Sequence, residues 1–169
     1  MNQVEKEKDF FYYKDYPWVV ITLRWFFLLL VFVLGLYIFL DFKQVLAYLY
    51  VFYAIFCLSL ILPLSRCVYC FYFGRFCNTG WGKVSAFLFE KKDEEEYLRR
   101  SSFYVLTYPL WFLPGLLALF ELVLKRNLKY LILFCGFVLL WLSGKFFLKW
   151  VCCKRCNKKD FCPEVPFKR

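Results

Sequence analysis

The chain contains four long apolar stretches separated by charged and turn-forming residues. They cover residues 18–40, 45–64, 103–124 and 128–150. A helix needs about 20 residues to cross roughly 30 Å of hydrocarbon, so each stretch is long enough to cross a membrane. Lipid offers no partners to backbone N–H and C=O groups, and such spans must therefore be helices. The pattern predicts an all-α integral membrane protein with four transmembrane helices.

The connections between these stretches predict two antiparallel helical hairpins. Residues 41–43 and 125–127 form very short links, which pair neighbouring helices, whereas the middle connection is long. We therefore expect a single membrane domain, residues 1–169, with helical hairpins at 17–64 and 103–150. A cysteine-containing loop at 66–102 and a cysteine-rich tail at 151–169 would form a small cytoplasmic cap. Pro109 and Pro114 are expected to bend the third helix.

Composition agrees with a bilayer environment and excludes several kinds of chemistry. Hydrophobic residues make up 62% of the 169 residues, more than the roughly one half that is typical of soluble domains. Histidine is absent, which excludes bis-histidine haem, histidine zinc sites and Ser-His-Asp triads. The net charge is +10, but the basic residues flank the apolar stretches. Membrane topology accounts for such flanking charge, and no nucleic-acid partner is expected.

The distribution of basic residues predicts the orientation. Seventeen lysines and arginines lie in the two terminal segments and the middle loop, and four lie at the short connections. By the positive-inside rule, we expect a multi-pass protein of the cell (inner) membrane with both termini in the cytoplasm. The remaining two, Arg24 and Lys145, lie within spans. We expect their long side chains to snorkel to the interface, with a lipid-headgroup or quinone contact as the functional alternative.

Six of the nine cysteines form two similarly spaced triplets. Each triplet reads C-x2-C, followed after six or five residues by a third cysteine. The first triplet begins 26 positions after Asp41 and the second 27 positions after Arg126, which indicates a parallel pseudo-repeat of the two hairpins. Such a repeat would bring the triplets together on the cytoplasmic face. The candidate metal ligands are Cys67, Cys70, Cys77, Cys153, Cys156 and Cys162.

Cysteines in this pattern favour a thiolate metal site. A C-x2-C turn places two sulfur atoms at the separation that one tetrahedral metal needs, and the reducing cytosol disfavours structural disulfides. Zinc is the expected metal, either one ion on four cysteines or two ions on six. The triplet spacing is similar to that of fungal binuclear zinc-cluster domains, but the resemblance covers only the spacing, so no DNA-binding role follows. An iron–sulfur cluster is the alternative, since Cys162 precedes a proline as in bacterial ferredoxin motifs.

Three cysteines lie outside the triplets, and a packing role is expected for the two that lie inside spans. Cys57 and Cys135 lie inside spans, and Cys152 is a spare thiol beside the second triplet.

These observations favour a non-enzymatic membrane protein. Its metal site would tie the two hairpins together, and it would act as a scaffold or subunit of a larger membrane assembly. The expected partners are the lipid bilayer and other membrane protein subunits. A membrane-bound thiol or iron–sulfur redox relay is one alternative, and soft-metal handling is another. The triplets could also be incidental thiols at the membrane rim.

Overall fold

The computed structural model describes residues 13–93 and 96–156 of the chain. Its regular structure is helical, and no strand occurs among the described residues. Four helical runs are long and apolar enough to cross a membrane: Trp18–Phe42, Gln44–Tyr69, Ser101–Lys125 and Leu128–Arg155. Only 6% to 28% of the residues in the apolar window of each run are buried inside the protein, so the rest of this surface needs lipid. The all-helical class and the four candidate spans expected from the sequence are confirmed.

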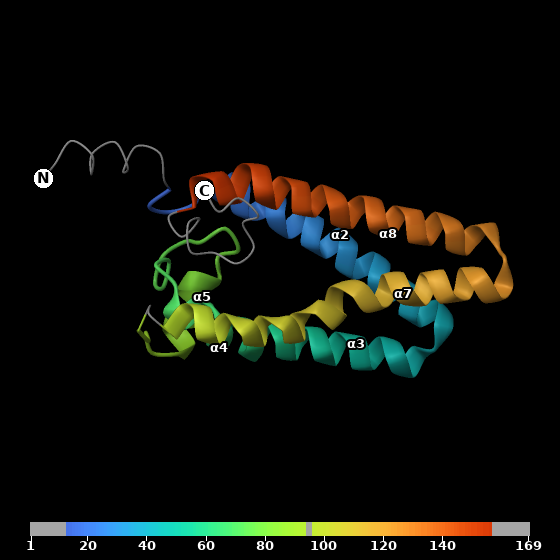
Figure 1. Ribbon diagram of the computed structural model, residues 1–169, viewed down its shortest axis with the longest axis horizontal. Helices are drawn as coiled ribbons and strands as arrows, with labels where there is room; N and C mark the ends of the chain where they lie inside the picture. Colours follow the sequence, from blue (N-terminus) through green and yellow to red (C-terminus); the bar gives the residue numbers. More distant parts are fainter. Residues whose placement is uncertain (1–12, 94–95, 157–169) are drawn as a thin grey trace, which may run out of the picture.

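Most of these runs are composed of shorter segments, labelled in Figure 1 where there is room. The first is α2 (Trp18–Phe42). The second comprises α3 (Gln44–Phe56), the π-helical η1 (Cys57–Ile61), α4 (Leu62–Ser65) and the 3-10 turn η2 (Cys67–Tyr69). After α5 (Trp81–Leu88) and α6 (Tyr97–Arg100), the third comprises the 3-10 helix η4 (Ser101–Thr107) and α7 (Tyr108–Lys125). The fourth comprises α8 (Leu128–Phe147), the π-helical η5 (Leu148–Cys152) and the 3-10 turn η6 (Cys153–Arg155).

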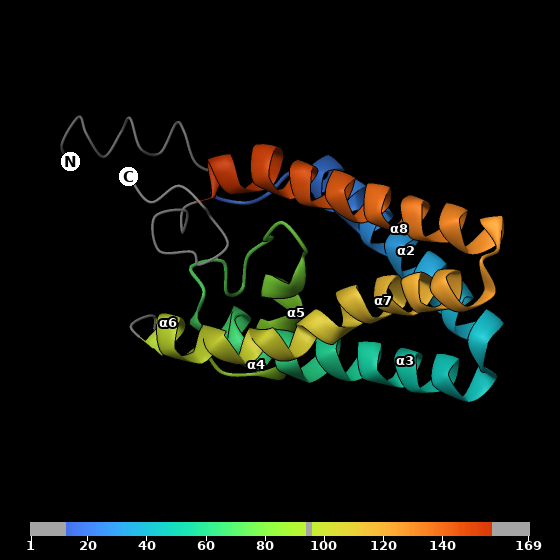
Figure 2. The same cartoon turned by 45° about the vertical axis from the view of Figure 1, so that its right-hand side comes forward.

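The four runs form a wedge that is narrow at one end. α2 packs against α3, α7 and α8, and α7 also packs against α8. In Figures 1 and 2, the four runs come together at the end that holds the short helix–helix connections. Toward the other end, α2 and α8 separate from α4 and the start of α7, and α5 lies in that region. We call these the closed end and the open end.

A proline and a glycine shape the closest helix contacts. Pro114 lies inside α7, where its ring removes the hydrogen bond that the carbonyl of Leu110 would otherwise accept. The Tyr50 hydroxyl of α3 donates to that carbonyl over 3.1 Å and replaces the lost bond. A Cβ at Gly35 of α2 would lie 2.9 Å from the Tyr50 oxygen and 3.0 Å from Pro114 Cγ. Glycine therefore allows α2 to approach both α3 and α7.

Polar contacts join the two helix–helix connections at the closed end. Asp41, near the end of α2, accepts hydrogen bonds from Lys129 Nζ at 2.6 Å and from the Tyr130 hydroxyl at 2.9 Å. The connection before α8 contains Arg126 in the left-handed region, with φ 47°. The Asn127 side chain then caps α8 by accepting from the Lys129 backbone N–H at 3.0 Å.

The segments differ from uninterrupted α-helices at three ends. The third run begins as the 3-10 helix η4 because Pro109 removes an N–H donor and its ring clashes with the carbonyl four residues earlier. The second run extends past residue 64, its expected end, through the last residue of α4 and the 3-10 turn η2. The fourth run extends past residue 150, its expected end, through the rest of η5 and the 3-10 turn η6. Each extension contains the first cysteine of a C-x2-C pair and the second cysteine directly follows it, so both pairs begin at helix ends rather than in separate loops.

Candidate functional site

The first C-x2-C pair forms a tight turn at the end of the second span. Cys67 begins η2, and the backbone N–H of Cys70 donates to the Cys67 carbonyl over 3.2 Å. Cys70 then adopts an extended backbone, with φ −92° and ψ 148°.

The second C-x2-C pair has the same local conformation. Cys153 begins η6, the N–H of Cys156 donates to the Cys153 carbonyl over 3.3 Å, and Cys156 is extended with φ −85° and ψ 130°. A π-helical segment precedes each pair, η1 before the first and η5 before the second. The two halves therefore share a local structure at their cysteines although their sequences otherwise differ.

Cys77 lies in a compact loop between η2 and α5. Its sulfur accepts a hydrogen bond from the Gly82 N–H at 3.3 Å and lies 3.2 Å from the Thr79 hydroxyl. Donors of this kind stabilise a thiolate. Gly82 has no room for a side chain, because a Cβ would lie 2.1 Å from the Tyr72 carbonyl oxygen and 2.4 Å from that of Arg75.

Cysteines of both triplets pack against one buried group, which we call the rim cluster. Its fully buried members are Tyr16, Ile21, Tyr72 and Cys152. Partly buried residues packed against it include Cys70, Cys77 and Cys156. The rim cluster therefore connects the loop after the second span with the end of the fourth.

The segment before α2 holds the rim cluster together. The Tyr16 hydroxyl donates to the Cys152 carbonyl over 2.8 Å, and the Tyr72 hydroxyl donates to the Tyr13 carbonyl over 2.8 Å. The Tyr13 N–H also donates to the Arg155 carbonyl over 3.1 Å. Burial strongly raises the pKa of Tyr16, so its hydroxyl remains a neutral donor at ordinary pH.

The described thiols do not form a compact ligand set. None of the eight described cysteines forms a disulfide within the described structure, and Cys162 lies outside the described residues. Within the described part of the chain, no three cysteine, aspartate or glutamate side chains gather closely enough to hold a metal ion. A metal ion would therefore have to draw the sulfur atoms of the two turns together. Cys57 is buried and Cys135 is exposed, and neither belongs to the rim cluster.

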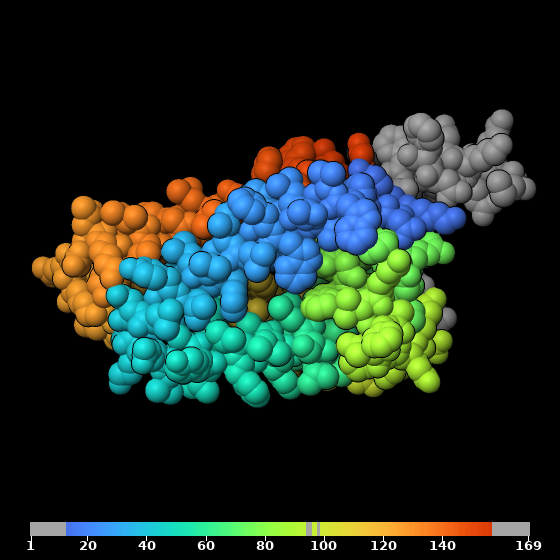
Figure 3. Space-filling model, turned by 180° about the vertical axis from the view of Figure 1, so that it is seen from behind, coloured from blue at the N-terminus to red at the C-terminus, as the bar shows by residue number. Residues whose placement is uncertain are grey.

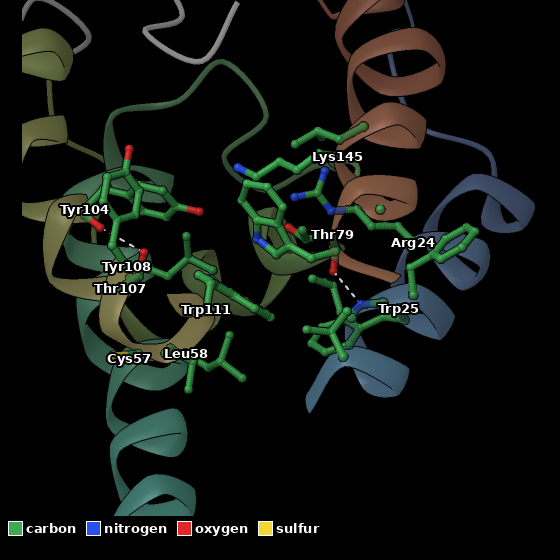
Figure 4. Close-up of a pocket in the computed structure, with 18 of the residues that line it drawn as sticks. Arg24, Trp25, Cys57, Leu58, Thr79, Tyr104, Thr107, Tyr108, Trp111 and Lys145 are labelled. Carbon is green, nitrogen blue, oxygen red and sulfur yellow. Dashed lines mark hydrogen bonds between the residues drawn. The ribbon is translucent and has the colours of Figure 1, made fainter. Parts of the chain in front are cut away.

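A cavity of about 330 Å³ lies beside the rim cluster, among residues of all four spans. Figure 4 shows Arg24 and Lys145 extending into this region from one side, opposite Tyr104 and Tyr108. In the space-filling view of Figure 3, atoms of the third span are visible in a hollow between the first two. Sequence reasoning missed this cavity, because it depends on how far the helices separate. The only sequence signal was the presence of two cations within apolar spans.

Arg24 differs from a side chain that snorkels to water. Its Nε and Nη1 atoms are buried and make no hydrogen bond in the described structure, and its guanidinium contacts the Cys152 thiol. Lys145 is exposed at the cavity edge, where its Nζ lies 5.6 Å from the centre of the Trp141 ring. The two cations face one cavity from adjacent helices.

Comparisons with protein-family models, curated proteins and solved structures find no match for the chain.

Proposed function

We propose that this chain is a polytopic membrane protein in which the two cysteine triplets bind zinc and tie two helical hairpins together. In this proposal the metal site lies on the cytoplasmic face, both termini lie in the cytoplasm, and the protein is a scaffold or subunit of a membrane assembly. The ligands come from Cys67, Cys70, Cys77, Cys153, Cys156 and Cys162. The role is structural rather than enzymatic.

One observation carries the proposal: the two C-x2-C pairs adopt the same turn and pack against the same buried cluster. In both pairs the second N–H donates to the first carbonyl, and the second cysteine is extended. Cys70 and Cys156, the second members of the two pairs, both contact the rim cluster. Tetrahedral zinc needs sulfur atoms about 2.3 Å from the metal, so binding would require the two turns to bring their sulfur atoms that close to one ion.

Hydrogen-bond donors and cations lie near some of the cysteines. Cys77 already accepts from the Gly82 N–H. Arg75, Lys154 and Arg155 are near the cysteines in sequence, and the cationic groups of Arg75 and Lys154 lie over the rings of Phe71 and Trp150. Nearby cations offset the charge that several thiolates bring to one metal.

Elemental analysis of the purified full-length protein tests the proposal. We expect colourless protein with one or two zinc ions per chain. Cys70→Ser and Cys156→Ser should each lower the zinc content and the melting temperature in detergent, because a closed thiolate site contributes folding free energy. Cys57→Ser and Cys135→Ser are matched controls outside the rim cluster and should leave the zinc content unchanged.

Other experimental outcomes would support a function other than the structural zinc site. Brown protein with broad absorption near roughly 400 nm that bleaches on reduction would indicate an iron–sulfur cluster and electron transfer. Metal-free protein that forms a reversible Cys67–Cys70 or Cys153–Cys156 disulfide would indicate a thiol relay. Metal content unaffected by either rim substitution would exclude the tie between hairpins.

A further inference from the structure

We propose that the cavity among the four spans binds a lipid phosphate, meaning a phosphate ester carried on a hydrocarbon chain, with the phosphate between Arg24 and Lys145. The site is separate from the cysteine triplets and does not depend on a metal. It uses the two cations within the spans, the buried donors beside them and the apolar wall of the cavity.

The charged residues that line the cavity are both cations, which favours an anionic ligand. Arg24 from α2 and Lys145 from α8 both line it, and no aspartate or glutamate does so among the described residues. Neither cation forms an ion pair with a described carboxylate. Two cations that share an apolar cavity repel each other, and Arg24 also loses hydration because two of its nitrogen atoms are buried. An anion between the two cations offsets both costs. A phosphate monoester carries a charge of about −1.5 to −2 at pH 7, which matches two cations.

Hydrogen-bond donors are also available. The Nε and Nη1 atoms of Arg24 are buried without a hydrogen bond, and so is Nε1 of Trp81, another residue of the cavity wall. A guanidinium presents its donors in a planar fork that fits two phosphate oxygens at once. Buried donors without partners are costly, and phosphate oxygens would satisfy them.

The rest of the cavity suits a hydrocarbon chain. Four of the six tryptophans of the chain line it: Trp25, Trp81, Trp111 and Trp141. Its volume of about 330 Å³ is near the lower limit for ligand pockets, about 300 Å³. This space accepts a headgroup and the start of one chain, and the rest of the chain would continue between the helices into the bilayer. A fatty acid would bring one charge to two cations, and inorganic phosphate would leave the apolar wall without contacts.

The tryptophans allow a direct binding experiment. Full-length protein in a neutral detergent is titrated with a lysophosphatidate whose chain carries bromine, which quenches tryptophan fluorescence on contact. A brominated lysophosphatidylcholine with the same chain is the headgroup control. We expect the lysophosphatidate to bind about tenfold or more tightly, because charge-assisted hydrogen bonds contribute a free energy of that size.

Substitutions assign the binding to the cavity. Arg24→Gln and Lys145→Gln should each weaken lysophosphatidate binding about tenfold, while Arg24→Lys should retain part of it. Lys43→Gln removes an exposed cation at the closed end and should change nothing, which controls for general attraction of anionic lipid. If Arg24→Gln does not fold, Lys145→Gln decides the question, because that side chain is exposed.

Several results would overturn the proposal. Equal quenching by the two lysolipids would show that the cavity does not recognise the phosphate charge. A brominated fatty acid that binds as tightly as the lysophosphatidate would exclude the phosphate assignment. Inorganic phosphate that competes at equal concentration would exclude the lipid chain, and unchanged binding in both glutamine variants would exclude the cavity.

Discussion

The hydroxyl of Tyr16 donates a 2.8 Å hydrogen bond to the backbone carbonyl of Cys152, which lies 136 residues further along the chain. Tyr16 precedes the first span, and Cys152 directly precedes the second cysteine pair. Both residues are buried, with 3% and 0% of their surfaces exposed. This single contact therefore attaches the start of the first span to the end of the fourth at the open end of the wedge.

The first prediction concerns this hydrogen bond. Tyr16→Phe keeps the ring but leaves the buried Cys152 carbonyl without its partner, at a cost of about 1–3 kcal/mol. We expect a lower melting temperature of the purified protein in detergent. Tyr48→Phe is the control, because Tyr48 is 69% exposed and its hydroxyl makes no bond within the described structure. Equal melting temperatures for Tyr16→Phe and wild type would show that the bond contributes nothing.

The second prediction is that alkaline pH lowers the free energy of unfolding, in part because the folded protein holds Tyr16 in its protonated form. Burial raises the pKa of Tyr16 in the folded protein, whereas an unfolded tyrosine titrates near about 10. Below pH 10 both states keep the proton. Above it the unfolded chain releases the proton and the folded protein retains it, so stability falls as pH rises. The advantage of wild type over Tyr16→Phe should therefore shrink between pH 9 and 11 by up to about 1.4 kcal/mol per pH unit above 10. A constant difference across that range would contradict this origin.

The third prediction compares two glycines of the loop that holds Cys77. Gly82→Ala places a Cβ within 2.1 Å of the Tyr72 carbonyl oxygen, so the loop must open. Gly74 has a φ of +76° but only one neighbour near its Cβ position, at 3.9 Å, so alanine there costs about 1 kcal/mol of backbone strain. We expect Gly82→Ala to lower the melting temperature much more than Gly74→Ala. It should also increase the reaction of Cys77 with a thiol reagent, because the opened loop exposes its partly buried sulfur to the reagent. Similar effects of the two substitutions would contradict the tight packing of this loop.

The sequence predicted the helices well because their signal is local. Each span is a long, predominantly apolar run, and the expected starts at residues 18, 45 and 128 lie within one residue of the observed starts. The local interruptions of the helices and the contacts that compensate for them were less predictable. Pro114 could be read as a disturbance of α7, but the replacement bond from Tyr50 depends on a contact between helices 60 residues apart.

The candidate site was less predictable than the helices. The spacing of the cysteines indicated two equivalent turns, and the two 3-10 turns η2 and η6 agree with it. The nearby sequence did not indicate that Tyr16 would be a buried member of the rim cluster, because its contacts are with Tyr72 and Cys152, which are far away in the chain. The cavity depends on the angle between helices, which apolar periodicity does not determine.

The fourth prediction concerns orientation. Cysteine replacements at Glu90 and Asn127 lie on opposite sides of the membrane if both termini and the middle loop are cytoplasmic. An impermeant thiol reagent should label Asn127→Cys in intact cells, and Glu90→Cys only after the membrane is opened, each compared with the unmodified chain. Labelling of Glu90→Cys in intact cells would place the rim cluster outside the cytoplasm and remove the argument that its thiols stay reduced.

The fifth prediction concerns the closed end, where Lys129 Nζ lies 2.6 Å from Asp41 Oδ1. This pair joins the end of α2 to the start of α8, and both side chains are partly exposed, at 24% for Asp41 and 41% for Lys129. A pair of this kind contributes about 0.5–1 kcal/mol and is weakened by salt.

A double-mutant cycle with Asp41→Asn and Lys129→Gln measures that contribution. Asp41→Asn should cost more than Lys129→Gln, because Asp41 also accepts from the Tyr130 hydroxyl at 2.9 Å and an amide donates where a carboxylate oxygen accepts. The double variant should lose less stability than the sum of the two single variants, and the difference should decrease in high salt. Strict additivity at low salt would mean that the two connections do not interact through this pair. Because the pair is far from the rim cluster in the wedge, neither variant should change zinc content, which separates closed-end stability from the metal site.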